Sequence, residues 1–220
     1  IYLYSGNTPK TLERFEAESN KGSQVMTLEP DMLTLKTEPR HLMANLKEAK
    51  GTEFEGHEFY EASSIRKIGD TYYFVYSSVV SSELCYATSK YPDRDYHFGG
   101  TLVNIGDIGI DGRTKEQPLN ALGNTHGGME LINGQWYIFY HRQTNRTNFS
   151  RQGCAEKITI EPDGSIRQVE VTSCGLNDGP LVAQGTYPAR ICCQLTGEKW
   201  NVYSNPETMK MDFPFLTQDL

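Results

Sequence analysis

One carboxylate in the sequence has a context suited to acid catalysis. Glu61 follows Phe59 and Tyr60 and begins a strand-like segment. Aromatic neighbours partly exclude water from a carboxyl group, and this raises its pKa and suits it to donate a proton as a general acid. Most of the 28 Asp and Glu residues must simply be solvated, so a catalytic carboxylate can be selected only by its position in the sequence. The competing interpretation is a strand-edge carboxylate that accepts hydrogen bonds from backbone N–H groups.

Two other side chains occupy comparable places later in the chain. His126 lies within Gly123-Asn124-Thr125-His126-Gly127-Gly128, where small residues permit close backbone approach beside a channel. A histidine there is either a metal ligand or a hydrogen-bonded core residue. Arg142 ends the run Tyr140-His141-Arg142, where its guanidinium could clamp a carboxylate or sugar hydroxyls. A solvent-facing arginine at a strand end is equally expected.

A repeated hairpin must position these residues. Ile65–Tyr76 aligns with Met129–Tyr140 at an offset of 64 residues, and each reads as a strand, a two-residue turn and a strand. The turns are Gly69-Asp70 and Asn133-Gly134, dipeptides that supply positive φ in tight hairpins. Ile1–Gly6 matches Tyr73–Ser78 at an offset of 72, which indicates that the sequence starts on the second strand of an earlier copy.

A second hairpin follows in each copy, within residues 24–37, 84–103 and 155–172. Four strands per repeat predict an all-β propeller, and residues 1–175 would form about three four-stranded blades, the first without its innermost strand. A β-sandwich is the alternative. Residues 176–220 are rich in proline and predict a closing or peripheral segment that leads toward a further module. The one helical candidate is Glu38–Lys50, in a connection.

Composition excludes several classes of partner. The net charge of −7 argues against nucleic acid and acidic membrane surfaces, and no apolar run approaches the roughly 18 residues of a membrane helix. The five scattered cysteines fit reduced thiols and a cytoplasmic location, with secretion as the alternative because the sequence begins within a strand. Dinucleotide, P-loop, zincin and α/β-hydrolase motifs are absent from the sequence.

Several segments together resemble glycoside hydrolase family 43. They are Glu55–Tyr73, Leu84–Ser89, Asn124–Gly127, Trp136–Arg142 and Ser150–Glu156, and the likeness extends from Ile1 to about Gly185. The sequence is similar in particular to bacterial α-L-arabinofuranosidase and β-xylosidase-like enzymes that carry a carbohydrate-binding module after the propeller. The resemblance implies a five-bladed propeller, of which this is the C-terminal part, and inverting hydrolysis of arabinose- or xylose-containing oligosaccharides.

The resemblance also assigns roles to individual residues. Glu61 matches the general acid, His126 matches a channel histidine beside a Ca²⁺ ion or a water, and Arg142 matches an arginine near the reaction centre. Tyr60 and Arg151 are expected to contact the substrate. One departure is Ser63, where the family often has proline; this affects the entry of the strand more than the chemistry.

Inversion needs a second carboxylate, about 6.5–9.5 Å from the acid, to activate water. The resemblance places that base, and an Asp that tunes the pKa of the acid, before Ile1. We therefore expect the 220 residues to be inactive alone, with both Asp residues supplied by missing N-terminal blades of the same polypeptide or of another chain. The alternatives are a non-catalytic carbohydrate-binding propeller fragment and a structural remnant that associates with another chain through an exposed blade face.

Overall fold

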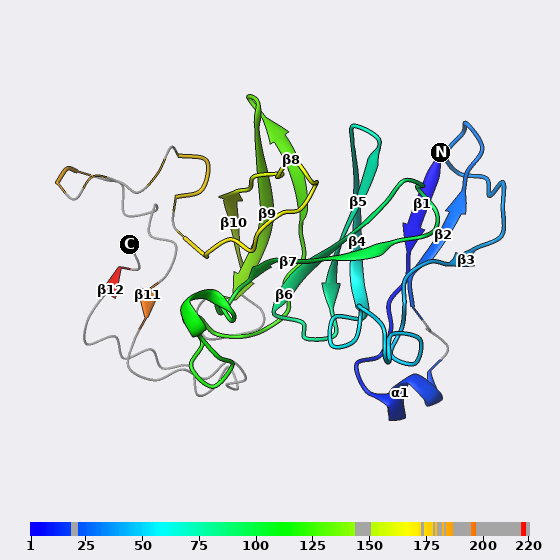
Figure 1. Cartoon of the computed structure of the whole chain (residues 1–220), viewed down its shortest axis with the longest axis horizontal. Coiled ribbons are helices and arrows are strands. Elements are labelled where there is room, and N and C mark those ends of the chain that lie inside the picture. The colour runs from blue at the N-terminus through cyan, green and yellow to red at the C-terminus, as the bar shows by residue number, and fades with distance from the viewer. Residues whose placement is uncertain are drawn as a thin grey trace.

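The computed structural model describes residues 1–18, 22–143, 151–172, 174–177, 179, 182, 184–186, 195–196 and 217–218. Three antiparallel sheets follow one another along the chain and stand side by side (Figure 1). The first sheet contains β1 (Tyr2–Ser5), β2 (Gln24–Thr27) and β3 (Arg40–His41). The middle sheet contains β4 (Phe59–Ile68), β5 (Thr71–Ser78), β6 (Glu83–Ser89) and β7 (His97–Asn104). The third sheet contains β8 (Gly128–Ile132), β9 (Gln135–Gln143) and β10 (Arg151–Lys157).

The remaining elements are short. They are helix α1 (Leu12–Ala17), the 3₁₀ helix η1 (Ile110–Gly112), and the paired strands β11 (Leu195–Thr196) and β12 (Thr217–Gln218). Most of the predicted closing segment, together with Cys192 and Cys193, lies outside the described residues. In the part of the chain that the structure describes, no helix has the length and apolarity to span a membrane.

Both predicted tight hairpins are confirmed. Gly69 has a φ of 57° between β4 and β5, and Asn133 and Gly134 have φ values of 49° and 83° between β8 and β9. Positive φ at both central residues is what a type I′ turn requires. The turn fixes the register of the second hairpin, which runs from Ile132 opposite Gln135 to Gly128 opposite Phe139.

The side chains of the middle sheet alternate between its two faces, and both faces are buried. Tyr73 and Val75 of β5 pack with Met129 and Ile138 of the third sheet. Phe74 and Tyr76, on the opposite face of β5, pack with core side chains that surround the first sheet: Met43, Ala49, Phe54 and Tyr4. Successive up-and-down sheets packed face to face are the arrangement of propeller blades, so the predicted all-β fold is confirmed.

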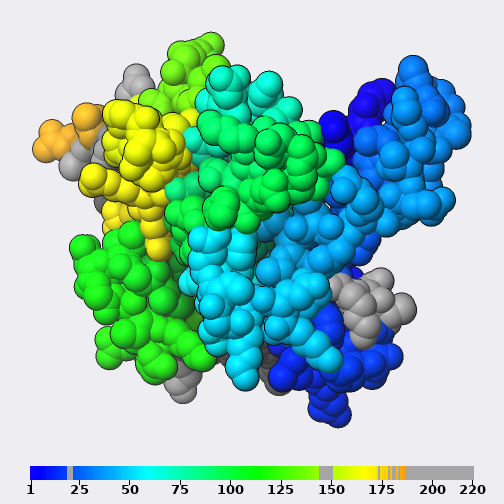
Figure 2. All heavy atoms as spheres, turned by 45° about the vertical axis from the view of Figure 1, so that its right-hand side comes forward, coloured from blue at the N-terminus to red at the C-terminus, as the bar shows by residue number. Residues whose placement is uncertain are grey.

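The third sheet differs from the predicted four strands. After Ile158 the chain leaves this sheet and runs back to the middle sheet, where Val169 forms a parallel bridge with Val103 of β7. Figure 2 shows these residues, in yellow, against green residues of the middle sheet. The backbone N–H of Ile166 also donates to the Tyr86 hydroxyl at 2.8 Å. Buried Ile166 and Val171 explain the path, because their side chains complete the core between the two sheets.

The predicted helix at Glu38–Lys50 is wrong. Arg40 and His41 form β3 because they pair with β2. The Asn45 side chain then accepts hydrogen bonds from the N–H groups of Lys47 and Glu48, which is turn chemistry that competes with a helix. The helix that forms is α1, whose N-cap Thr11 accepts from the N–H of Arg14.

Candidate active site

A bulge interrupts β4 at the predicted catalytic carboxylate. The register against β5 shifts between Phe59 and Glu61 and again between Glu61 and Ser64. Inside the bulge Ala62 has a φ of 67°, a left-handed conformation that costs a residue with a Cβ about 1–2 kcal/mol. Bulges re-aim side chains beside active sites. The strained backbone at Ala62 therefore sets the direction of the neighbouring Glu61 side chain.

The Glu61 carboxylate contacts His126, which in turn contacts His141. Its Oε1 lies 2.8 Å from Nε2 of His126, which precedes β8 by two residues. Nδ1 of His126 lies 3.1 Å from Nε2 of His141 in β9. The side chains of Glu61 and His126 are 25% and 33% exposed, so the pair remains open to a ligand. The three residues form one hydrogen-bonded chain between the middle and third sheets.

The hydrogen bonds determine which nitrogens carry protons. An ionised carboxylate only accepts, so Nε2–H of His126 donates to Glu61. In a neutral His126, Nδ1 then accepts from Nε2–H of His141; in a charged His126, Nδ1–H donates to Nε2 of His141 instead. Burial, followed by the charges of His126 and Arg151, lowers the pKa of His141 to about 4, so His141 is neutral at neutral pH. Nδ1 of His141 is buried and finds no hydrogen-bond partner within the described ranges.

The pKa of Glu61 is lowered, and the predicted upward shift is wrong. The hydrogen bond from His126 is the largest cause, and the charges of His126, Lys10 and Arg151 act in the same direction. Burial of the carboxylate raises the pKa but is outweighed. The Phe59 ring does not supply the expected shielding, because it packs in the core between the first and middle sheets.

Replacing His126 with alanine is expected to raise the pKa of Glu61, because the largest cause of its lowering is removed while burial remains. His126→Gln, which keeps an N–H donor, should raise the pKa less. Carbon-13 NMR of the Glu61 carboxyl group, assigned by its loss in Glu61→Gln, measures both values. An unchanged or lower pKa in His126→Ala would show that His126 does not control this carboxylate.

The same pair gives stability a pH dependence. Because the pKa of Glu61 is lower in the folded chain than in the unfolded chain, the hydrogen bond stabilises the fold above the usual pKa of glutamate. That contribution is lost as the pH falls through the folded-state pKa. In His126→Ala the acid side of the stability profile should therefore be flatter than in the unmodified chain.

A cavity of about 990 Å³ has Lys10, Tyr60, Asn124 and Arg151 in its wall. Glu61, His126 and His141 do not line it, but the charges of Lys10 and Arg151 act on Glu61, so the cavity lies near the acid. Tyr60 directly precedes Glu61 on β4. The Lys10 ammonium lies 4.2 Å from the centre of the Tyr60 ring, and Arg151 donates to the Asn124 side chain at 3.0 Å. Two of the predicted substrate residues, Tyr60 and Arg151, are thus brought into one cavity beside the predicted acid.

Arg142 is not brought to this cavity. The residue is 3% exposed, and its guanidinium donates to the Asn120 side chain at 3.2 Å. Side chains alternate along β9, so Arg142 and His141 leave opposite faces of the strand. The charge of Arg142 acts instead on Asp107, which follows β7. A contact between Arg142 and substrate stays a prediction, and its burial favours a role in packing the third sheet on the middle sheet.

His141 is the site residue that the sequence interpretation missed. The signal was present, because a two-residue turn at Asn133-Gly134 sets Ile132 opposite Gln135. Extending that register toward the open end of the hairpin places His126 opposite His141. Lys10 was missed for a different reason: it reaches the site from the segment before α1, and no local pattern indicates that path.

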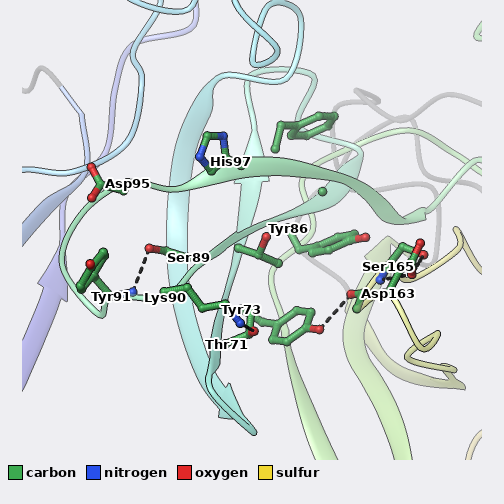
Figure 3. A pocket seen from close by; sticks show the side chains of 14 residues that line it. Thr71, Tyr73, Tyr86, Ser89, Lys90, Tyr91, Asp95, His97, Asp163 and Ser165 are labelled. Carbon is green, nitrogen blue, oxygen red and sulfur yellow. Dashed lines mark hydrogen bonds between the residues drawn. The ribbon is translucent and has the colours of Figure 1, made fainter.

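A second cavity, of about 600 Å³, lies on the outer side of the middle sheet (Figure 3). Its aromatic rings are not open platforms for a sugar: Tyr73 and Tyr86 stack on each other and are only 3% and 1% exposed. Gly99 also lies against the Tyr86 ring, since a Cβ built on Gly99 would be 2.2 Å from a ring carbon. The Tyr73 hydroxyl already donates a hydrogen bond to the Gly164 carbonyl at 2.9 Å. These contacts make this cavity a poorer sugar site than the one beside Tyr60.

The residues around His126 do not fit the implied calcium ion. Calcium takes about six to eight oxygen ligands, whereas both ring nitrogens of His126 are engaged, by Glu61 and His141. The one group of three metal-binding side chains among the described residues does not include His126. A calcium ion bound to a ring nitrogen of His126 would first have to displace the hydrogen bond to Glu61 or the one to His141.

Comparison with known sequences identifies the family. The sequence pattern of "Glycosyl hydrolases family 43" matches residues 1–166. The chain belongs to glycosyl hydrolase family 43. This family 43 chain is 52% identical over 221 residues to a "Xylosidase/arabinosidase" of Thermoclostridium stercorarium, a match that covers 99% of the chain and 46% of that relative. The chain therefore spans about half the length of this curated relative.

Solved structures support the fold of the family 43 chain. An arabinoxylan arabinofuranohydrolase from Bacillus subtilis matches with a TM-score of 0.58 and 21% identity, over 80% of this chain and 36% of that one. A β-xylosidase/α-arabinofuranosidase from a compost metagenome, solved with xylotriose in a calcium-free form, matches with a TM-score of 0.56 and 21% identity, over 76% and 53%. These family 43 neighbours are β-propellers, which confirms the fold class; the number of blades stays a prediction.

Proposed function

We propose that this chain carries the general acid of a glycosidase that hydrolyses arabinofuranosyl or xylosyl linkages in oligosaccharides, and that Glu61 is this acid. The observation that carries the proposal is the Glu61 carboxylate held 2.8 Å from His126 at a strained bulge. The cavity of Tyr60 and Arg151 lies beside it. The names of the relatives, xylosidase and arabinosidase, support the substrate class.

In the proposed reaction, protonated Glu61 gives its proton to the glycosidic oxygen while the bond from that oxygen to the anomeric carbon breaks. Water attacks the same carbon from the opposite face, its proton passes to a second carboxylate, and the configuration inverts. Nε2–H of His126 then donates to the carboxylate that Glu61 has become, which stabilises the product state of the transfer. Tyr60 and Arg151 are the proposed sugar contacts.

The second carboxylate is proposed to lie outside these 220 residues. The charges that act most strongly on Glu61 are cationic: His126, Lys10 and Arg151. They favour the ionised form, whereas a general acid at neutral pH needs a nearby negative charge or stronger burial to keep its proton. The chain matches only 46% of the curated relative. The rest of a longer polypeptide could therefore supply both groups: the base, and a negative charge that raises the pKa of Glu61.

The 220 residues alone are therefore expected to hydrolyse aryl arabinofuranosides and xylosides at least about 100-fold more slowly than the same chain extended by its natural upstream sequence. Both proteins are verified by intact mass before initial rates are compared. If the two proteins hydrolyse at equal rates, and Glu61→Gln abolishes hydrolysis in both, the base cannot lie outside the 220 residues. Glu61 would still be the acid. Proton NMR of the first-formed anomer tests inversion separately.

A carbohydrate-binding role without catalysis is the competing function. Titration calorimetry of the extended polypeptide with xylo- and arabino-oligosaccharides separates the two roles. Binding that survives in Glu61→Ala, together with no hydrolysis by the unmodified extended polypeptide, would favour the binding role. The glycosidase role requires hydrolysis that depends on Glu61.

A further inference from the structure

Three metal-binding side chains converge outside the proposed acid site. Glu83 and Cys85 are two residues apart on β6, so they leave the same face of the strand. His57 lies two residues before β4 and reaches both. One ligand atom from each, Nδ1 of His57, a carboxylate oxygen of Glu83 and Sγ of Cys85, lies within 4.8 Å of the other two. Within the described ranges this is the only such group.

The distances are close to those of a coordination shell. Nδ1 of His57 lies 2.7 Å from Oε1 of Glu83 and 3.8 Å from Sγ of Cys85, and this Sγ lies 3.3 Å from the same Oε1. Tetrahedral zinc, with bonds of about 2.0–2.1 Å to nitrogen and oxygen and about 2.3 Å to sulfur, separates N and O by about 3.3 Å and S from either by about 3.6 Å. Only the His57–Glu83 pair must move apart by more than a few tenths of an ångström.

We propose that His57, Glu83 and Cys85 bind one divalent transition-metal ion of the zinc class, with a fourth coordination position open to the cavity beside Tyr60. A thiolate and an imidazole select zinc-class ions over Ca²⁺ and Mg²⁺, which prefer oxygen ligands. The cavity supplies the entry path, because His57 and Glu83 form part of its wall. Three protein ligands with one open position are a recurrent zinc arrangement.

The charges of the ligands match that of a divalent ion, which must compete with protons for them. Glu83 and Cys85 are buried, at 5% and 0% exposure, and the carboxylate and a thiolate together would neutralise a divalent ion. Burial and the Glu83 charge raise the pKa of the Cys85 thiol, so the ion must displace its proton on binding. Ser78 donates to Glu83 at 2.6 Å and Thr101 at 3.3 Å, contacts that orient the carboxylate.

The test uses the 220-residue chain with Cys192→Ser and Cys193→Ser, which removes two thiols outside the described residues. After chelator treatment, Co²⁺ is titrated in as a spectroscopic substitute for Zn²⁺. We expect one equivalent to bind and to produce a thiolate-to-cobalt charge-transfer band, and Zn²⁺ to remove the band by competition. This readout does not depend on glycosidase activity. A negative result would therefore contradict the metal site without affecting the proposed function.

Variants assign the ligands. Cys85→Ser should abolish the charge-transfer band, and His57→Ala should weaken binding at least about 100-fold, because loss even of outer-shell partners costs 10–100-fold. Cys174→Ser is the matched control and should keep both. Absence of the band, or saturable binding unchanged in His57→Ala, would overturn the proposal and leave Glu83 as a buried carboxylate satisfied by hydrogen bonds. If Cys85→Ser does not fold, the half-buried His57→Ala decides.

Discussion

In the polypeptide that also supplies the base, Glu61→Gln is expected to lower kcat by about 10²–10⁴-fold on xylosides and arabinofuranosides with poor leaving groups. Glutamine keeps the size of the side chain and a contact to His126, but it cannot give a proton to the leaving oxygen. An aryl glycoside whose leaving group departs as a stable anion needs no such proton. Its hydrolysis by Glu61→Gln should therefore fall far less.

Initial rates on a matched pair of aryl glycosides, one with a good and one with a poor leaving group, measure this difference. Glu130→Gln is the control, because Glu130 is exposed on β8, in an ion pair with Arg66. It should leave both rates unchanged. Equal losses on both glycosides in Glu61→Gln would assign Glu61 to positioning or binding and contradict its role as proton donor.

Gly127→Ala is expected to be the most damaging single-methyl change near the site. A Cβ at Gly127 would lie 1.9 Å from the carbonyl oxygen of Phe139 and 3.0 Å from a methyl group of Leu84. The oxygen belongs to the backbone of β9 and cannot turn away, so β8 and β9 must separate. We expect a loss of unfolding free energy on the order of 3–5 kcal/mol, or failure to fold.

Gly153→Ala is the control, because nothing lies within 4 Å of a Cβ built at Gly153 in β10. It should change the unfolding free energy by less than about 0.5 kcal/mol. Urea unfolding followed by circular dichroism compares the two variants. A Gly127→Ala chain with an unchanged midpoint would mean that β8 does not approach β9 as closely as described. In the extended polypeptide, where activity is expected, a folded Gly127→Ala variant should also lose activity, since His126 is its neighbour.

The parts of this fold that follow from local chemistry could be predicted. Gly69-Asp70 and Asn133-Gly134 mark their hairpins because few other dipeptides accept positive φ, and the alternation of side chains in β5 follows from strand geometry. Glu61 and His126 could be selected by position, since each lies near the start of the first strand of its sheet.

The properties that depend on distant contacts could not be predicted. The lowered pKa of Glu61 comes mainly from His126, which is 65 positions away in the chain. The bulge at Ala62 leaves no composition signal, since alanine is an uncommon residue in the left-handed region. The path of residues 158–172 back to β7 depends on Tyr86, whose hydroxyl has no local reason to point there.

The return of the chain to the middle sheet affects how the site assembles during synthesis. Three backbone N–H groups, those of Ile166, Val169 and Val171, donate hydrogen bonds to groups on or next to the middle sheet. These hydrogen bonds hold the third sheet to the middle sheet. Glu61 emerges from the ribosome about 110 residues before Val171, which at bacterial and eukaryotic elongation rates is a delay of roughly 5–20 s. During that interval the carboxylate has no secured histidine partner. The nascent chain thus carries an uncovered face of the middle sheet until these three residues have been synthesised.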